Sequence, residues 1–148
     1  MSLQDRLMAD LKDAMRSRDT ARIETLRMAR SAVKYKEIEL QRDATDDEVV
    51  EVLSREARRR TEAIEMFRKG GRQDLVSKEE AELEILEEYL PEQMSEDEVK
   101  DVVQRIVVDL GATDMSDLGA VMRQAMSDLK GKADGRLVNQ MAREILSQ

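Results

Sequence analysis

The sequence lacks the residue types on which most enzyme active sites depend. Its 148 residues include no histidine, no cysteine and no tryptophan. Without these there is no thiolate nucleophile, no histidine-containing triad and no zinc site of the usual kind. Carboxylates are the remaining acids, and the pairs Glu79-Glu80 and Glu87-Glu88 could offer oxygen ligands to a divalent cation. Adjacent glutamates on helices are more often solvated, so we expect no catalytic residue, metal or cofactor.

The most distinctive local feature is a short segment that combines glycines with cations. It contains Lys130, Gly131, Lys132, Gly135 and Arg136. A helix that starts here would direct unpaired backbone amides outward, and a phosphate group binds readily to such amides. The segment is therefore either a small anion-binding site or a simple corner whose next helix is capped by Asp134. Because Asp134 would occupy part of the amide site itself, the residues alone favour the corner.

Two other basic groups could contact phosphate groups. The first group has the spacing that gathers side chains on one side of a helix, and consists of Arg27, Arg30 and Lys34. Arg55 and Arg59 share the outer face of the following helix, where a solvated surface is the simpler interpretation. Arg60 lies close to the apolar stripe of that helix, so we expect it to form a partly buried ion pair with a glutamate of a neighbouring helix.

The charge and hydropathy of the chain limit its partners. The net charge is −8, and the excess of acid begins in residues 77–90, which hold one lysine and six glutamates. An acidic total opposes non-specific polyanion binding, so DNA is not an expected partner, although a local basic face remains possible. No apolar run approaches the roughly 20 residues of a membrane span, and no signal peptide is evident. We therefore expect a cytoplasmic protein without membrane contact.

Apolar residues recur at intervals of three and four along the whole chain, which predicts an all-α fold. Proline and glycine are so scarce that they mark boundaries, chiefly at Pro91, Gly70-Gly71 and Gly111. The pattern predicts seven helices, at about residues 3–17, 20–41, 45–69, 77–90, 95–110, 116–130 and 134–146. The single proline suggests a four-helix subdomain over residues 1–91 and a three-helix subdomain over residues 92–148.

Three capping boxes predict where helices begin. Each has a Ser or Thr followed three residues later by Glu, and the boxes start at Thr45, Ser77 and Ser95. In such a box the hydroxyl and the carboxylate bond two otherwise unpaired amides reciprocally. None of these hydroxyls has an evident general base nearby in sequence, so we interpret them as caps and not as nucleophiles.

Three segments of the sequence resemble the YqeY-like family. They are Thr45–Glu56, Ala81–Gln93 and Lys130–Gln140 with its Gly-Lys-Ala-Asp-Gly core. The resemblance covers essentially the whole chain in the same order. Members of this family are small, freestanding bacterial proteins, similar to the C-terminal tail of the B subunit of the glutamyl-tRNA(Gln)/aspartyl-tRNA(Asn) amidotransferase. The resemblance implies two small helical subdomains.

The resemblance also implies an accessory role with tRNA. In the amidotransferase the tail helps to recognise tRNA, whereas amide transfer and kinase chemistry belong to other domains. Carbon–nitrogen ligase activity with glutamine as amide donor would thus belong to the larger enzyme. Carried over to this sequence, the glycines of Gly131–Val138 would shape a corner, and Lys132 and Arg136 would face nucleic acid.

A second hypothesis is a helical scaffold that binds a protein and no RNA. Ten methionines against three aromatic residues suit either a helical core or an adaptable docking surface. The acidic residues between 77 and 101 would then suit a basic partner, such as a tRNA-handling protein. Binding to tRNA and capture of a specific protein after nuclease treatment distinguish the two hypotheses.

Overall fold

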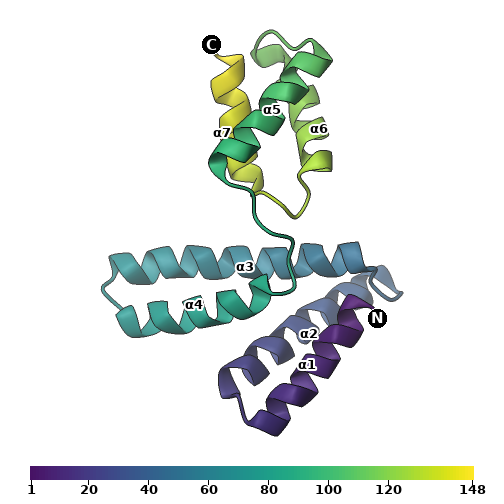
Figure 1. Ribbon diagram of the computed structural model, residues 1–148, viewed down its shortest axis with the longest axis vertical. Helices are drawn as coiled ribbons and strands as arrows, with labels where there is room; N and C mark the ends of the chain where they lie inside the picture. The colour runs from purple at the N-terminus through teal and green to yellow at the C-terminus, as the bar shows by residue number, and fades with distance from the viewer. The chain divides into compact units, whose positions relative to one another are not determined.

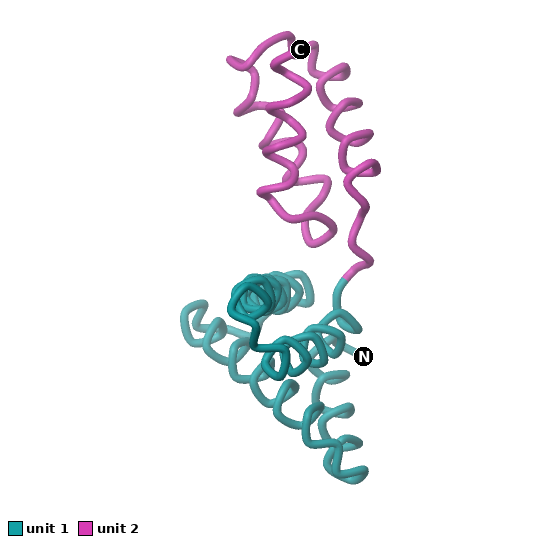
Figure 2. The backbone as a smooth tube through the Cα atoms, turned by 90° about the vertical axis from the view of Figure 1, so that its left-hand side faces the viewer, with its two compact units in different colours: residues 1–90 teal, residues 91–148 magenta.

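The computed structural model describes all 148 residues and is entirely helical, which confirms the all-α class (Figure 1). The elements are α1 (Leu3–Ser17), α2 (Thr20–Leu40), α3 (Asp46–Lys69), α4 (Gln73–Glu87), α5 (Glu96–Leu110), the 3-10 helix η1 (Met115–Asp117), α6 (Leu118–Asp128) and α7 (Gly135–Leu146). The chain divides into two compact units, residues 1–90 (unit 1) and residues 91–148 (unit 2), which are coloured separately in Figure 2.

Unit 1 consists of two helical hairpins packed on each other. α1 lies beside α2 and α3 beside α4, while α2 also packs on both α3 and α4 (Figure 1). The apolar stripes of all four helices meet in one core, whose fully buried members include Leu7, Leu26, Val33, Val49, Leu53 and Leu86. The unit thus has a core of its own, as a domain of this length requires.

Unit 2 is a three-helix bundle with a second core. α5 packs on α6 and α7, and these two pack on each other. The fully buried members of the core include Val99, Val103, Val121, Ala125 and Val138. Gly111 has a φ of 65° and ends α5 with a left-handed C-cap, as its position in the sequence predicts.

Two of the three predicted capping boxes are present. The Thr45 hydroxyl accepts from the Glu48 amide at 3.2 Å while the Glu48 carboxylate accepts from the Thr45 amide at 3.0 Å. Ser95 and Glu98 repeat the arrangement at the start of α5. A further box joins Ser2 and Asp5 at the start of α1.

The box predicted at Ser77 is wrong, because α4 starts at Gln73 and carries Ser77 in its interior. Val76 is fully buried, and its amide donates to the carbonyl of Arg72 at 3.1 Å. An ion pair between Arg72 and Asp74 at 3.1 Å supports the first turn. Burial of Val76 in the core therefore extends the helix by a turn, and tertiary packing overrides the local capping signal.

Two other predicted boundaries are corrected as well. α4 ends at Glu87, and Tyr89 and Leu90 follow in a turn. α6 spans only Leu118–Asp128, because the Asp117 carboxylate accepts from the Thr113 amide at 2.9 Å and tightens the preceding residues into η1.

The capping box of α3 makes the stability of unit 1 depend on pH. Arg42 donates to the Glu48 carboxylate at 2.7 Å, and this bond, together with the Thr45 amide, lowers the pKa of Glu48 from its usual 4.5 to about 2. Since the folded-state pKa is the lower one, the stabilisation is complete above about pH 4.5 and is lost as the pH falls towards 2.

We expect Glu48→Gln to flatten the fall in melting temperature over this acid range, because the substituted side chain does not titrate. Thermal unfolding followed by circular dichroism at a series of pH values measures how the melting temperature changes with pH in each variant. Asp47→Asn is the matched control, since Asp47 lies in the same first turn outside the box. An unchanged acid slope in Glu48→Gln would contradict the assignment.

Candidate nucleic-acid interface

The structure places the residues of the glycine-containing segment in a corner between α6 and α7. The Asp134 carboxylate accepts from the Arg136 amide at 3.0 Å and is the N-cap of α7. Gly131 adopts a left-handed conformation with a φ of 76°. The capped amide is no longer available to a phosphate group, so this geometry matches the corner rather than the anion cradle.

The corner is also held by the segment that precedes α5. The Met94 amide donates to the Lys132 carbonyl at 2.9 Å, and the Gln93 side-chain amide donates to the Gly131 carbonyl at 2.9 Å. These bonds fix the backbone that carries the three cations of the segment. Lys130, Lys132 and Arg136 are all exposed on this corner.

Substitution by alanine should affect the free energy of unfolding differently at the two glycines of the corner. Gly131→Ala forces a Cβ atom into a left-handed backbone, which is expected to lower the free energy of unfolding by about 1–2 kcal/mol. At Gly135, in the first turn of α7, an added Cβ would meet Met126 at an ordinary 3.5 Å. Gly135→Ala is therefore expected to be neutral or to stabilise by up to about 1 kcal/mol.

Urea unfolding of the two variants measures the difference. Equal effects of the two substitutions would contradict the conformational assignment, since only one site needs a positive φ.

The basic residues of α2 lie on its exposed side. Arg27 and Lys34 are exposed and Arg30 is half-buried. Neither Arg27 nor Arg30 forms an ion pair, and the charge of Lys34 acts on the Glu37 carboxylate, whose pKa it helps to lower. Glu37 is itself engaged, because it accepts from the Ala44 amide at 2.8 Å and from Gln4 at 3.1 Å. Glu37 nevertheless keeps its negative charge beside Lys34, so the positive charge of this face is compensated in part and comes chiefly from Arg27 and Arg30.

Two apolar side chains share this face of α2, and the sequence pattern did not reveal their exposure. Tyr35 is 73% exposed and Ile38 is 69% exposed. The core stripe of α2 runs through Leu26, Ala29 and Val33. At 100° per residue, Tyr35 and Ile38 fall on the side away from this stripe, with Ile38 about 20° and Tyr35 about 80° around the helix from Arg27. That displacement from the stripe is the signal that would have identified them. We call Arg27, Arg30, Lys34, Tyr35 and Ile38 the α2 face.

The exposed side of α3 is different, because acids are interleaved with the bases. Arg59 pairs with Glu56 at 3.4 Å, and Arg55 is exposed nearby. Glu51 and Glu62 belong to the same helix, and each takes part in a polar or electrostatic interaction. The structure thus brings Arg55 and Arg59 to one surface, as predicted, but this surface is mixed in charge.

Arg60 is buried, which confirms the predicted ion pair with a neighbouring helix. The residue is 5% exposed, and its guanidinium lies 3.5 Å from the Glu82 carboxylate of α4 and 3.2 Å from Glu56 of its own helix. It also donates to the sulfur of Met28 on α2 at 3.1 Å. The side chain therefore joins three helices and is not available to a ligand.

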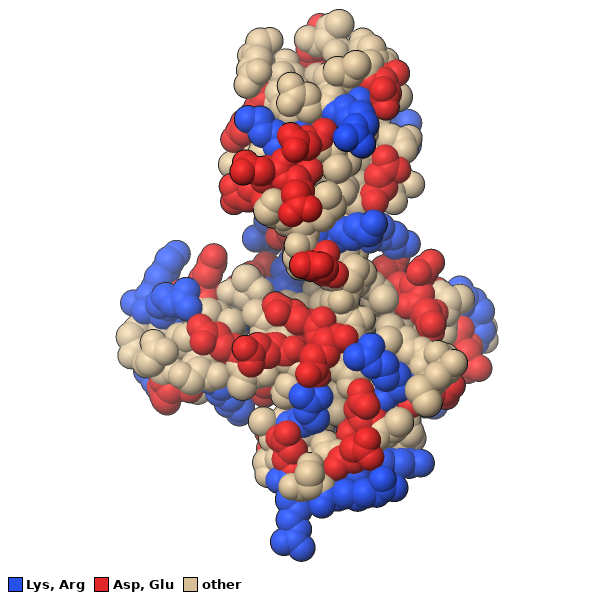
Figure 3. Space-filling view, viewed as in Figure 1, with Lys and Arg blue, Asp and Glu red and all other residues tan.

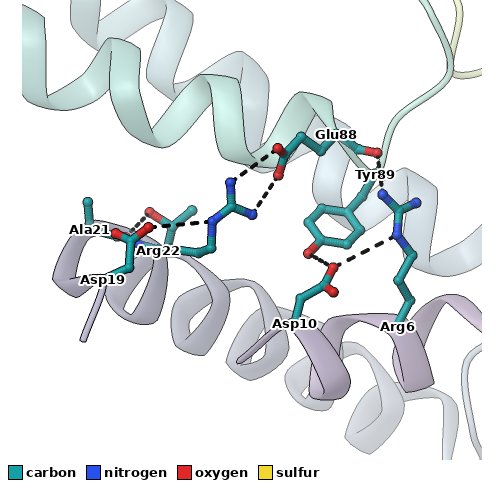
Figure 4. A network of polar contacts seen from close by, with 8 residues as sticks. Arg6, Asp10, Asp19, Ala21, Arg22, Glu88 and Tyr89 are labelled. Carbon is teal, nitrogen blue, oxygen red and sulfur yellow. Dashed lines mark hydrogen bonds and ion pairs between the residues drawn. The ribbon is translucent and has the colours of Figure 1, made fainter. Parts of the chain in front are cut away.

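A second polar network, centred on Tyr89, holds the end of α4 against α1 and α2 (Figure 4). The Tyr89 hydroxyl donates to Asp10, and the Arg6 guanidinium lies 4.5 Å from the centre of the Tyr89 ring. Burial of the ring, followed by the bond to Asp10, raises the pKa of Tyr89 above its usual value. Arg22 pairs in a bidentate manner with Glu88 at 2.7 and 3.1 Å.

This network borders an open groove. The groove is lined by Arg6, Asp10, Asp13, Ala14, Ser17, Asp19, Arg22 and Glu88. A raised tyrosine pKa keeps the hydroxyl protonated, the opposite of what a nucleophile needs. The cations of the groove are already engaged by carboxylates or the tyrosine ring. The arrangement is a structural clamp, which the sequence pattern alone did not reveal.

Charges of both signs are interspersed over the surface. Figure 3 shows acidic and basic groups side by side on the face viewed, with Lys and Arg gathered at the lower end of unit 1, near the connection between α1 and α2. No group of three or more acidic side chains is placed to hold a metal ion. No helix is both long enough and apolar enough to cross a membrane.

The fold and its surfaces thus define an all-α protein of two small helical units that carries basic surface groups. The sequence matches the model of the Yqey-like protein family over residues 4–146. The chain belongs to the YqeY-like family.

Curated relatives support this membership and correct one expectation. A 31% identical relative from Pyrenophora tritici-repentis aligns over 95% of this chain and 79% of its own length. Relatives from Kluyveromyces lactis (38% identical) and Lachancea thermotolerans (40%) align over 74% and 57% of this chain, and over 61% and 46% of their own lengths. All three are named altered inheritance of mitochondria protein 41, mitochondrial. The predicted cytoplasmic location is therefore wrong, and the family extends beyond bacteria.

Proposed function

We propose that this chain is an accessory module that binds tRNA and has no catalytic site of its own. The observation that carries the proposal is the α2 face, where Arg27, Arg30 and Lys34 gather on one side of a helix without forming an ion pair, whereas Arg22, Arg42 and Arg60 each form one. Like charges three and four residues apart on a helix repel each other. An anionic ligand removes that repulsion, and RNA supplies a row of phosphate groups.

The resemblance to the amidotransferase tail supports the same proposal from a different direction. It concerns the corner, where Lys130, Lys132 and Arg136 would form a second contact with RNA. The capped amide of the corner makes these side chains, and not the backbone, the contacting groups. A helical protein that contacts RNA through side chains can recognise its shape without reading base pairs.

Binding of purified protein to bulk tRNA tests the proposal. For each phosphate neutralised, the logarithm of the affinity should fall by roughly 0.7–0.9 per tenfold increase in salt. Arg27→Gln/Arg30→Gln/Lys34→Gln should weaken binding and reduce this slope by roughly two to three. The variant Lys130→Ala/Lys132→Ala/Arg136→Ala measures how much the corner contributes to tRNA affinity. The variant Arg55→Gln/Arg59→Gln measures the contribution of α3.

A control with the same change in net charge separates local contacts from the overall field. Lys100→Gln/Arg105→Gln/Arg123→Gln alters three exposed cations on α5 and α6. It should bind tRNA nearly as well as the unaltered chain. Absence of tRNA binding at low salt would overturn the proposal.

The alternative function is a protein-interaction scaffold without RNA binding. Its specific support is the exposure of Tyr35 and Ile38, since exposed apolar groups often mark docking sites. Capture of one protein that survives nuclease treatment, together with an absence of tRNA binding, would favour this alternative.

A further inference from the structure

Tyr35 is the most accessible aromatic ring of a chain that has very few. The chain has two tyrosines, one phenylalanine and no tryptophan. Tyr89 is 4% exposed and Phe67 is half-buried, whereas Tyr35 is 73% exposed. Ile38, one helical turn further along, is exposed to a similar degree. Neither side chain packs in the core of unit 1, so the core does not account for their types.

These two side chains form a small apolar platform with positive charge along one edge, because Lys34 lies one helical turn before Ile38, whereas Glu39 lies one turn after Tyr35. Arg27 and Lys34 lie on the same side of α2, and Arg30 lines a cleft of about 70 Å³ between α1 and α2. The cleft is also lined by Lys34 and by Glu37, whose carboxylate is held by Ala44 and Gln4. An exposed aromatic ring together with cations on the same helix is the combination that binds single-stranded nucleic acid.

We propose that the α2 face recognises an unpaired segment of RNA, with Tyr35 stacked on a base and the neighbouring cations on its phosphates. This inference rests on the proposed RNA-binding function and names the part of the RNA that is bound. In a duplex the base faces are covered by their neighbours, and the deep major groove of RNA does not admit side chains. An exposed ring can therefore reach a base face only where the strand is unpaired.

The size of the platform favours a nucleotide over a protein surface. A stable protein interface buries about 800 Å² on each partner and is centred on several apolar side chains. Here there are only two apolar residues, and Lys34 lies next to them on the helix surface. Such a patch matches one base and its adjacent phosphates better than the centre of a protein interface.

The intrinsic fluorescence of the chain offers a direct test. Without tryptophan, emission comes from Tyr35 and Tyr89, and only Tyr35 is exposed. Titration with a short oligouridylate should quench part of this emission as a base stacks on Tyr35. In Tyr35→Phe the ring remains, so binding measured by anisotropy of a labelled oligonucleotide should stay within about twofold. The quenching should disappear, since the remaining tyrosine is buried.

Tyr35→Leu is the variant expected to lose binding to single-stranded RNA. It keeps an apolar side chain but removes the ring, so affinity for oligouridylate should fall by about 5- to 100-fold. An RNA duplex of similar length should bind more weakly than oligouridylate and should be insensitive to Tyr35→Leu. Because Tyr35 is exposed, its substitution is expected to leave the fold intact, as circular dichroism would verify.

The outcomes distinguish the inference from the function on which it rests. Equal binding of tRNA and oligouridylate by Tyr35→Leu and the unaltered chain would overturn the inference while tRNA binding stands. Tighter binding of duplex than of single strand would also overturn it. If the unaltered chain binds neither tRNA nor oligouridylate, both proposals fail together.

Discussion

Arg60→Ala is expected to lower the free energy of unfolding by about 3–5 kcal/mol. The substitution removes the cation that lies between Glu56 and Glu82, whose side chains are only 14% and 12% exposed. Glu56 keeps a contact with Arg59, but Glu82 is left as a buried carboxylate without a cation. An uncompensated buried charge costs far more than the net stabilisation that an ion pair provides. Urea unfolding monitored by far-ultraviolet circular dichroism measures the loss.

Two variants separate this explanation from a general effect of removing arginine. Arg55→Ala, on the same helix but exposed, should change stability by less than about 0.5 kcal/mol. Arg60→Met/Glu82→Leu removes both charges and keeps most of the volume, so it should recover much of the stability lost in Arg60→Ala. A double variant as unstable as Arg60→Ala would show that packing, and not charge, dominates at this site.

Tyr89→Ala is expected to destabilise unit 1 by about 3–5 kcal/mol, as do other deletions of buried aromatic rings. The ring is 4% exposed and belongs to the unit 1 core, and it carries the contacts to Arg6 and Asp10. Its loss leaves a cavity between α4 and α1. It also releases the end of α4 from the clamp of Figure 4. Thermal unfolding of the full chain measures the change.

Tyr89→Phe isolates the hydroxyl from the ring. The variant loses only the bond to Asp10, whose side chain is 33% exposed and can be hydrated instead. The expected loss is therefore about 0.5–1.5 kcal/mol. If Tyr89→Phe were as unstable as Tyr89→Ala, the polar network would matter more than the buried ring.

The candidate site could be predicted in part. The spacing of Arg27, Arg30 and Lys34 places them on one side of a helix whatever the rest of the chain does, because helical geometry is local. Whether those cations are paired depends on carboxylates outside their own helix. Arg22 and Arg42 have sequences around them that look no different, yet Glu88 and Glu48 engage them. The absence of such a pair at Arg27 and Arg30 is therefore a property that the tertiary structure decides.

The sequence by itself determined the all-α class, most helix boundaries and the capping of α3, α5 and α7, because periodicity and caps act within a few residues. Its limit is clear at Ser77, where a correct capping pattern lies inside a helix because the core buries Val76. Only the tertiary structure decided which glutamate reaches Arg60 and how Tyr89 joins Arg6 and Asp10. These properties depend on which helices become neighbours, and long-range packing decides that.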